Sequence, residues 1–204
     1  MIPSFFDRIY ATREWISTLS KNDRELVTEV TTQELEKISG LKTPNQVVAV
    51  IRQFENKEPV GEDLTLYLDA IQDPGNLGTI IRTADWFGVK QLVCSAGCAD
   101  MYNPKVIQST MASIARVQVY YDENGDWLAK QTMPVYAATL DGSSLYEHHK
   151  IVNGILVIGN ESKGISSEVL KYAQQRITIP RKGGAESLNA AVATGVILSH
   201  LMGR

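Results

Sequence analysis

The sequence is poor in the residues from which metal sites and disulfide frameworks are built. It holds only two cysteines, Cys94 and Cys98, and three histidines among its 204 residues. A structural zinc site takes four such ligands in a characteristic spacing, and no such pattern occurs here. We therefore expect no metal centre, and in a reducing compartment we expect no disulfide between the two cysteines.

Long apolar runs and an excess of positive charge are also missing. No apolar stretch approaches the roughly 20 residues that span a bilayer, and the first eight residues do not resemble a secretory signal, so we expect a cytoplasmic protein. Lysine and arginine number 20 against 23 acidic residues, a net charge of −3. This balance argues against nucleic-acid binding by bulk electrostatics alone. Any RNA contact must come from local cations, for which the candidates are Arg82, Lys163, Arg181 and Lys182.

The glycine-rich motifs of common nucleotide-binding proteins are absent too. Neither G-x-x-x-x-G-K-[ST] nor G-x-G-x-x-G occurs in the chain. These loops cradle phosphates at the start of a helix, so their absence disfavours kinases and NAD-dependent enzymes.

From residue 64 onward, short apolar runs alternate with segments of helical periodicity. This alternation is typical of crossover units that feed a parallel sheet. It predicts strands at 64–68, 91–94, 117–121, 135–139, 155–158 and 176–179. Helices are predicted near 76–87, 104–112, 125–131, 166–173 and 188–202. The predicted fold is therefore a doubly wound α/β domain over residues 64–204.

The first 55 residues form a separate predicted module. Its order is strand, helix, strand, helix, strand, over 8–11, 12–19, 26–30, 32–38 and 46–51. Thr31 and Glu34 have the spacing of a capping box at the second helix. Residues 54–63 are polar, charged and interrupted by proline and glycine, which predicts a linker.

Three polar, glycine-containing clusters follow strands, where ligands bind in parallel sheets. They span residues 73–82, 159–166 and 179–189. Each also has a purely structural interpretation: Asn76 and Ser187 have the chemistry of helix N-caps, and the middle cluster could be an ordinary loop. Arg82 is harder to explain structurally, because it lies nearly two turns along its helix, from where a long cation could reach back over the strand ends.

The three clusters together resemble the sequence blocks of the SpoU-type methyltransferases of the SPOUT superfamily. Asn76, Gly78 and Arg82 match the first block, N-x-G-x-x-x-R, and Gly159, Glu161 and Gly164 match the second, G-x-E-x-x-G. The third block, I-P-x-x-G-x-x-E-S-L-N-x-x-V-A, is matched from Ile179 to Ala193, with Ala190-Ala191 where a Val-Ser pair is common. The three blocks occur in this order within residues 64–204.

This resemblance implies a parallel sheet whose C-terminal part is tied in a deep trefoil knot. It implies transfer of a methyl group from S-adenosylmethionine to a ribose 2′-hydroxyl in rRNA or tRNA, and a homodimer. The cofactor would be contacted by backbone around Thr139, Gly159, Ile179 and Leu188. Residues 1–55 resemble the later part of a ribosomal-protein-like RNA-binding domain, without the first strand and helix usual in relatives.

The resemblance also assigns roles within the site. Arg82 is the residue placed at the reacting hydroxyl, either as a base or as a positioning cation, and the second role suits a guanidinium that stays protonated. Glu161 could hold Arg82 or Asn76 in place. Asn189 and Ser187 could hold the ribose or a phosphate, and Asn76 sets the first loop.

Two other functions remain open from the sequence. One is an RNA-binding protein of the same fold that has lost catalysis, which the short first module and the negative charge suggest. The other is a base methyltransferase of a related knotted family. The first block and the Ser-Leu-Asn of the third favour ribose as the target.

Overall fold

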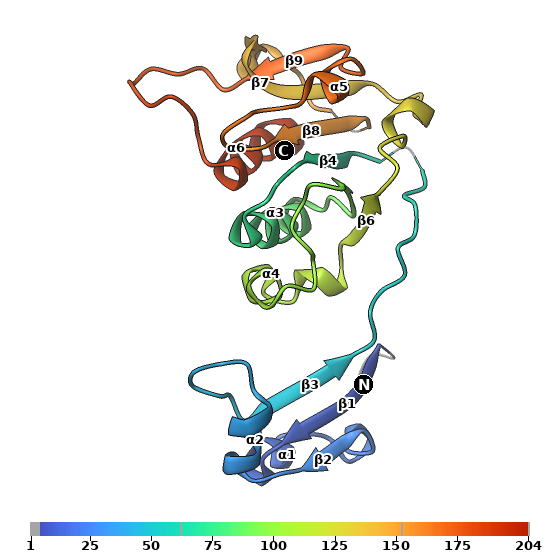
Figure 1. Cartoon of the computed structure of the whole chain (residues 1–204), viewed down its shortest axis with the longest axis vertical. Helices are drawn as coiled ribbons and strands as arrows, with labels where there is room; N and C mark the ends of the chain where they lie inside the picture. Colours follow the sequence, from blue (N-terminus) through green and yellow to red (C-terminus); the bar gives the residue numbers. More distant parts are fainter. Residues whose placement is uncertain (1–4, 62, 152, 204) are drawn as a thin grey trace. The chain divides into compact units, whose positions relative to one another are not determined.

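A computed structural model describes residues 5–61, 63–151 and 153–203 (Figure 1). Residues 1–4 of the predicted first module, residue 62 of the predicted linker and residue 204 lie outside the described residues. The chain divides into two compact units, Met1–Glu55 and Asn56–Arg204. We describe each unit by itself.

The first unit is a small three-stranded α/β module. Its strands are β1 (Phe6–Ala11), β2 (Val27–Glu29) and β3 (Val47–Ile51) in the order β2-β1-β3, with β1 parallel to β2 and antiparallel to β3. The helices are α1 (Arg13–Ser17) and α2 (Thr32–Ile38), with a 3-10 turn at Lys21–Asp23. The predicted capping box is confirmed: Thr31 and Glu34 exchange side-chain and backbone hydrogen bonds at the start of α2. All five predicted elements of this module are present.

The second unit is built on a six-stranded sheet in which every pair is parallel. The strands are β4 (Thr65–Asp69), β5 (Gln91–Ser95), β6 (Gln118–Asp122), β7 (Val135–Ser144), β8 (Ile155–Gly159) and β9 (Gln175–Thr178), in the order β6-β5-β4-β8-β7-β9. The central strands β4 and β8 are almost entirely buried, as expected for parallel strands covered on both faces. All six predicted strands are confirmed.

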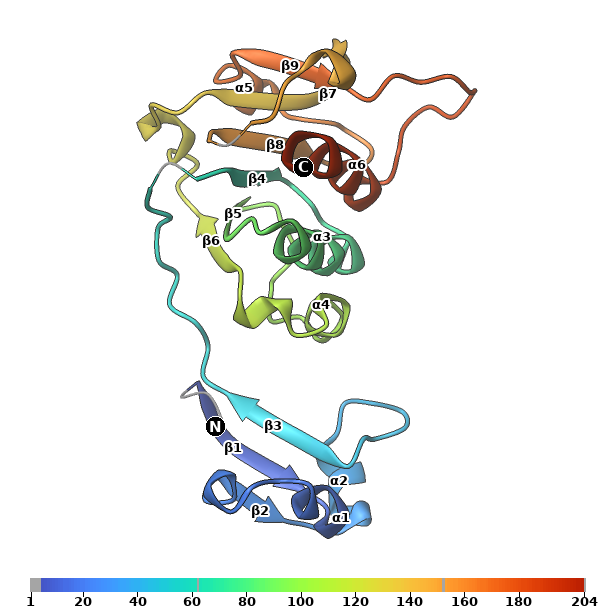
Figure 2. The same ribbon diagram turned by 180° about the vertical axis from the view of Figure 1, so that it is seen from behind.

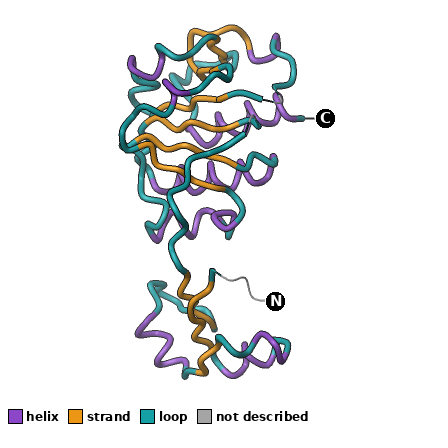
Figure 3. Tube along the Cα trace, turned by 90° about the vertical axis from the view of Figure 1, so that its right-hand side faces the viewer, coloured by secondary structure: helices purple, strands orange, loops and turns teal. Residues whose placement is uncertain are grey.

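Helices cover the two faces of this sheet unequally. On one face lie α4 (Pro104–Thr110), α3 (Pro74–Phe87) and α6 (Ala190–Met202), with α3 packed against both of the others (Figure 2). The other face is covered by a core that includes Trp127, Leu128, Ile165 and Val169. These residues come from the 3-10 helix Leu128–Lys130, the short helix α5 (Ser167–Leu170) and the chain next to them. The unit is therefore covered on both sides (Figure 3).

The predicted helices at 125–131 and 166–173 are too long. The first is reduced to the 3-10 turn Leu128–Lys130, because the buried Asp122 carboxylate accepts hydrogen bonds from the backbone amides of Asp126 and Trp127 and fixes a tight turn there. The second is reduced to α5, a single turn capped by Ser166. Two further 3-10 turns, Ser113–Ala115 and Leu145–Glu147, complete the unit.

The predicted linker, 54–63, belongs to the second unit from Asn56 onward. The Asn56 side chain exchanges two hydrogen bonds with the backbone of Tyr121 in the edge strand β6, at 2.8 and 3.2 Å. The Lys57 carbonyl accepts a third from Gln118, at 2.6 Å. The segment therefore covers an edge that would otherwise present unpaired backbone groups. Among the described residues, no helix is both long enough and apolar enough to span a membrane.

A strained turn after α4 gives a stability prediction. Met111 and Ala112 both adopt left-handed conformations, with φ of 47° and 68°. A left-handed conformation costs a residue with a Cβ about 1–2 kcal/mol, and glycine avoids that cost but loses more entropy on folding. We expect Ala112→Gly to raise the free energy of unfolding by about 0.5–1 kcal/mol, measured by denaturant titration.

The matched control is Ala115→Gly three residues later. Ala115 is also exposed, but it ends the 3-10 turn at Ser113–Ala115 and has no positive φ. There the substitution should lower the free energy of unfolding, because it only adds freedom to the unfolded chain. Equal losses of stability in both variants would contradict a strained Ala112.

Candidate functional site

A pocket of about 1030 Å³ opens at the carboxyl ends of the strands β8 and β9, beside residues 138–140 in the middle of β7. Its walls come from the second and third polar clusters and from α6. Apolar side chains such as Ile158, Ile177 and Ile197 line it, together with polar groups of residues 159–164 and 178–188. Its size and lining suit an organic ligand of the size of a nucleoside derivative.

The loop after β8 is held rigidly beside this pocket. Asn160 and Gly164 exchange two backbone hydrogen bonds, at 2.9 and 3.0 Å, and Gly164 takes the positive φ of 69° that closes the turn. The Asn160 side chain donates to the Ala70 carbonyl at 2.8 Å. Asp69, at the end of β4, accepts a 2.7 Å hydrogen bond from the Ser166 amide. The loop that carries Glu161 is thus fixed to the end of the central strand.

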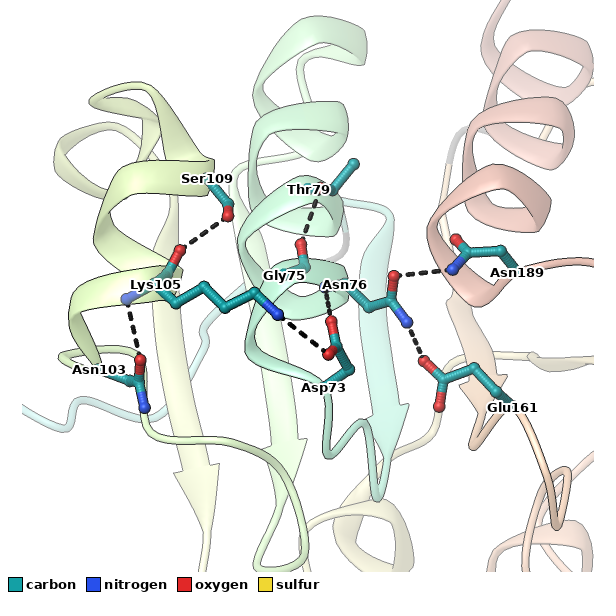
Figure 4. A network of polar contacts seen from close by, with 9 residues as sticks. All are labelled: Asp73, Gly75, Asn76, Thr79, Asn103, Lys105, Ser109, Glu161 and Asn189. Atoms are coloured by element: carbon teal, nitrogen blue, oxygen red, sulfur yellow. Dashed lines mark hydrogen bonds and ion pairs between the residues drawn. The ribbon is translucent and has the colours of Figure 1, made fainter.

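Asn76 joins the first cluster to the other two (Figure 4). Its side-chain nitrogen donates a short hydrogen bond to a carboxylate oxygen of Glu161. Its side-chain oxygen accepts a hydrogen bond of 2.8 Å from the side-chain nitrogen of Asn189. Both ends of the Asn76 amide are therefore occupied, which fixes its orientation. The structure thus brings together three of the predicted site residues. Glu161 is 85 positions and Asn189 is 113 positions from Asn76 in the sequence.

The helix caps differ from the predicted ones. Asp73, not Asn76, is the N-cap of α3: its side chain accepts a 2.8 Å hydrogen bond from the Asn76 amide, and Pro74 occupies the first helical position. Asn189, not Ser187, is the N-cap of α6, and it accepts from the amides of Ala191 and Val192 at 3.0 and 3.2 Å. An Asp-Pro pair is a typical helix start, so the true beginning of α3 was present in the sequence.

Arg82 and Ser187 stay outside this network. Arg82 is exposed on α3 and makes no hydrogen bond or ion pair with any described residue. Of the two partners considered for Glu161, the structure pairs it with Asn76. Ser187 lies on the exposed loop that lines the pocket. An arginine without a partner on a well-packed helix is available to a ligand.

The predicted cofactor contacts all line the pocket: Thr139, Gly159, Ile179 and Leu188. The Thr139 hydroxyl is buried beside the Asp141 carboxylate and lowers the pKa of that carboxyl, although within the described residues no hydrogen bond of ordinary length and angle reaches it. A hydroxyl has one donor and two acceptor positions, so it can also bond to a polar atom of a ligand. The pocket residues therefore fit a cofactor with both apolar and polar parts, as S-adenosylmethionine is.

Lys105 and Asp73 are a pair that the sequence motifs do not mark. The Lys105 ammonium lies 3.3 Å from the Asp73 carboxylate, which places α4 in contact with the first turn of α3. The close packing of these helices explains a glycine of the first block: a Cβ on Gly78 would lie 2.6 Å from the Val106 carbonyl oxygen. Gly78 is thus a packing residue.

Comparisons with known proteins agree with this geometry. The family model of the SpoU rRNA Methylase family matches residues 63–199. The chain is 34% identical over 174 residues to the 23S rRNA (guanosine(2553)-2′-O)-methyltransferase RlmP of Bacillus subtilis, covering 81% of this chain and 68% of that protein. It is 31% identical over 202 residues to the 23S rRNA (uridine(2479)-2′-O)-methyltransferase of Streptomyces viridochromogenes, covering 88% and 70%.

Solved structures give the same result. A TrmH-family protein from Porphyromonas gingivalis superimposes with a TM-score of 0.87 at 40% identity, covering 97% of this chain and 82% of that one. The SpoU methyltransferase AviRb from Streptomyces viridochromogenes, in complex with AdoMet, gives 0.78 at 27% identity, with coverage of 97% and 82%. The predicted α/β fold is confirmed by these matches. The chain belongs to the SpoU rRNA methylase family.

Proposed function

We propose that the protein methylates a ribose 2′-hydroxyl in structured RNA, with ribosomal RNA as the first candidate, using S-adenosylmethionine. The observation that carries this proposal is the joining of Asn76, Glu161 and Asn189 beside a pocket of cofactor size. The named activities of the relatives in Bacillus subtilis and Streptomyces viridochromogenes support the ribose target. The similar structure of AviRb in complex with AdoMet supports the cofactor.

The residues around the pocket have separate tasks in this reaction. When bound, the cofactor supplies an activated methyl group. The chain must hold the hydroxyl oxygen in line with that group, since alignment is a large part of such catalysis. A guanidinium presents several donors in a planar fork, so we assign Arg82 to orienting the hydroxyl and binding the neighbouring phosphate. Glu161 and Asn189 keep the Asn76 amide in one orientation.

RNA contacts near the pocket come from local cations. Lys163, Arg181 and Lys182 all line the pocket and are exposed. Phosphate contacts from such cations give affinity that falls as salt rises, even in a protein with a net charge of −3. Because relatives in Bacillus subtilis and Streptomyces viridochromogenes are named for methylating bacterial ribosomal RNA, we propose a cytoplasmic location.

The knot, the dimer and the role of the first module are further properties that the family resemblance implies. We propose that the segment from β7 to α6 forms the trefoil knot and that the protein works as a homodimer. Apolar side chains that one copy leaves exposed support the dimer: Leu188 is 47% and Val192 53% exposed at the start of α6. We propose RNA binding for the module at residues 1–55. Light scattering after gel filtration tests the dimer.

Labelled S-adenosylmethionine and total RNA from a strain that lacks the gene test the reaction. After digestion to nucleosides, we expect the label in a 2′-O-methylated nucleoside. Label on a base would support the base methyltransferase instead. Normal cofactor binding without any labelled RNA would support the RNA-binding protein that has lost catalysis. Mapping the labelled nucleotide then identifies the target.

A further inference from the structure

The first turn of α3 is held from outside by a second helix. One oxygen of the Asp73 carboxylate accepts the 2.8 Å hydrogen bond from the Asn76 amide. The other accepts a 3.3 Å hydrogen bond from the Lys105 ammonium on α4. Asn76 continues the chain of contacts to Glu161 and Asn189. A continuous polar connection thus runs from α4 through α3 to the loop after β8 and to α6 (Figure 4).

The Asp73 carboxylate is the centre of this connection. The hydrogen bond from the Asn76 amide, followed by that from Lys105, holds the pKa of the Asp73 carboxyl below its ordinary value. Asp73 is therefore ionised at neutral pH and can accept both hydrogen bonds at once.

The local backbone makes room for this pair. A Cβ on Gly75 would lie 2.9 Å from an Asp73 carboxylate oxygen and 3.3 Å from Cε of Lys105. Lys105 is itself fixed near the start of α4, where its amide donates to the Asn103 side chain at 2.9 Å and its carbonyl accepts from Ser109 at 2.7 Å. The lysine is thus directed across the glycine toward the cap of α3.

Stability alone does not account for this arrangement. The Lys105 and Asp73 side chains are 60% and 47% exposed, and ion pairs so exposed contribute little to folding. Neither residue lines the pocket. Their contacts lead instead to Asn76, whose side chain joins Glu161 to Asn189.

We propose that Lys105 and Asp73 are positioning residues for methyl transfer, which hold Asn76 in the orientation that Glu161 and Asn189 require. This inference rests on the proposed function. Lys105 keeps one carboxylate oxygen of Asp73 engaged, so that the other stays on the Asn76 amide. The backbone and the side chain of Asn76 are then fixed from opposite sides.

Three variants and a matched control test this. Asp73→Asn keeps an oxygen that can cap α3 but loses the charge that Lys105 contacts, and Lys105→Met keeps the length of the side chain without its charge. The third variant combines both substitutions. The control is Lys130→Met, because Lys130 and Asp126 form an ion pair of 2.8 Å with similar exposure on the opposite face of the sheet.

Single-turnover rates are measured with labelled S-adenosylmethionine and total RNA from a strain that lacks the gene. We expect about 5–10-fold lower rates for Lys105→Met and for Asp73→Asn, because small misplacements of positioning groups slow a reaction strongly. Affinities for S-adenosylmethionine and for the RNA should stay within about 2-fold. The combined variant should be no slower than either single variant, since both remove one connection. Lys130→Met should match the parent chain.

Amide hydrogen exchange of Asn76 adds a readout that does not depend on activity. It should be several-fold faster in Lys105→Met than in the parent chain and unchanged in Lys130→Met. Unchanged exchange together with an unchanged rate overturns the proposal. Additive rate losses, or weaker and less salt-dependent RNA binding in Lys105→Met, also overturn it, because Lys105 would then contact RNA phosphate directly. If the parent chain binds the cofactor but labels no ribose, the proposed function itself fails.

Discussion

Replacing Arg82 by alanine is expected to lower the rate of ribose methylation by about 100- to 1,000-fold, the loss typical of removing one fixed charge from a transition state. Arg82 is exposed and has no partner among the described residues, so its removal should leave the free energy of unfolding within about 0.5 kcal/mol of the parent. Affinity for S-adenosylmethionine should not change, because Arg82 does not line the pocket.

Arg82→Lys separates the two roles considered for this residue. Lysine keeps the positive charge but lacks the planar pair of donors that a guanidinium presents to a phosphate and a hydroxyl. If Arg82 orients the substrate, the lysine variant should recover part of the rate, and its pH dependence should follow that of the parent. Lys90→Ala, at another exposed cation just after α3, serves as the control and should retain full activity. A fully active Arg82→Ala would contradict any role at the reacting hydroxyl.

The sheet could be predicted from the sequence because its strands are buried on both faces. Runs such as Ile155-Leu156-Val157-Ile158 are apolar at every position, short, rich in β-branched residues and bounded by glycine, which favours a parallel strand covered on both faces. The helices on the face of the sheet that α3 covers could also be predicted, from their helical periodicity. The elements that cover the other face could not be predicted. The Asp122 carboxylate accepts hydrogen bonds from the backbone amides of Asp126 and Trp127, where a helix was predicted, and periodicity does not reveal such side-chain hydrogen bonds.

Three of the predicted site residues meet in the structure, but their pairing could not be predicted from the sequence. Asn76, Glu161 and Asn189 stood out as polar residues after strands, yet sequence spacing does not show which amide meets which carboxylate. Side-chain chemistry alone does not distinguish Asp73 from Asn76 as the cap of α3, because both side chains have an oxygen that can accept from a backbone amide. Lys105 could not be found at all, since its role depends on how closely α4 packs against α3 at Gly75 and Gly78.

Gly159 gives the second large expected effect. It was predicted as a cofactor contact, and the structure adds a reason of packing. A Cβ at this position would lie 2.5 Å from the Ile165 amide nitrogen and 2.7 Å from the Gly164 carbonyl oxygen. Both are backbone atoms, in the segment that Asp69 holds through the amide of Ser166. Because backbone cannot rotate away, the loop must move as a whole.

We therefore expect Gly159→Ala to lower the free energy of unfolding by about 2–3 kcal/mol and the affinity for S-adenosylmethionine by at least about 10-fold. Denaturant unfolding measures the change in the free energy of unfolding, and calorimetric titration measures the affinity for S-adenosylmethionine. Gly183→Ala is the matched control, because Gly183 also lines the pocket, has no positive φ, and has no atom of a described residue within 4 Å of its Cβ position. It should bind the cofactor and unfold as the parent does. Were Gly159→Ala to lose cofactor affinity without any loss of stability, direct contact with the cofactor, and not the crossing of two backbone segments, would explain this glycine.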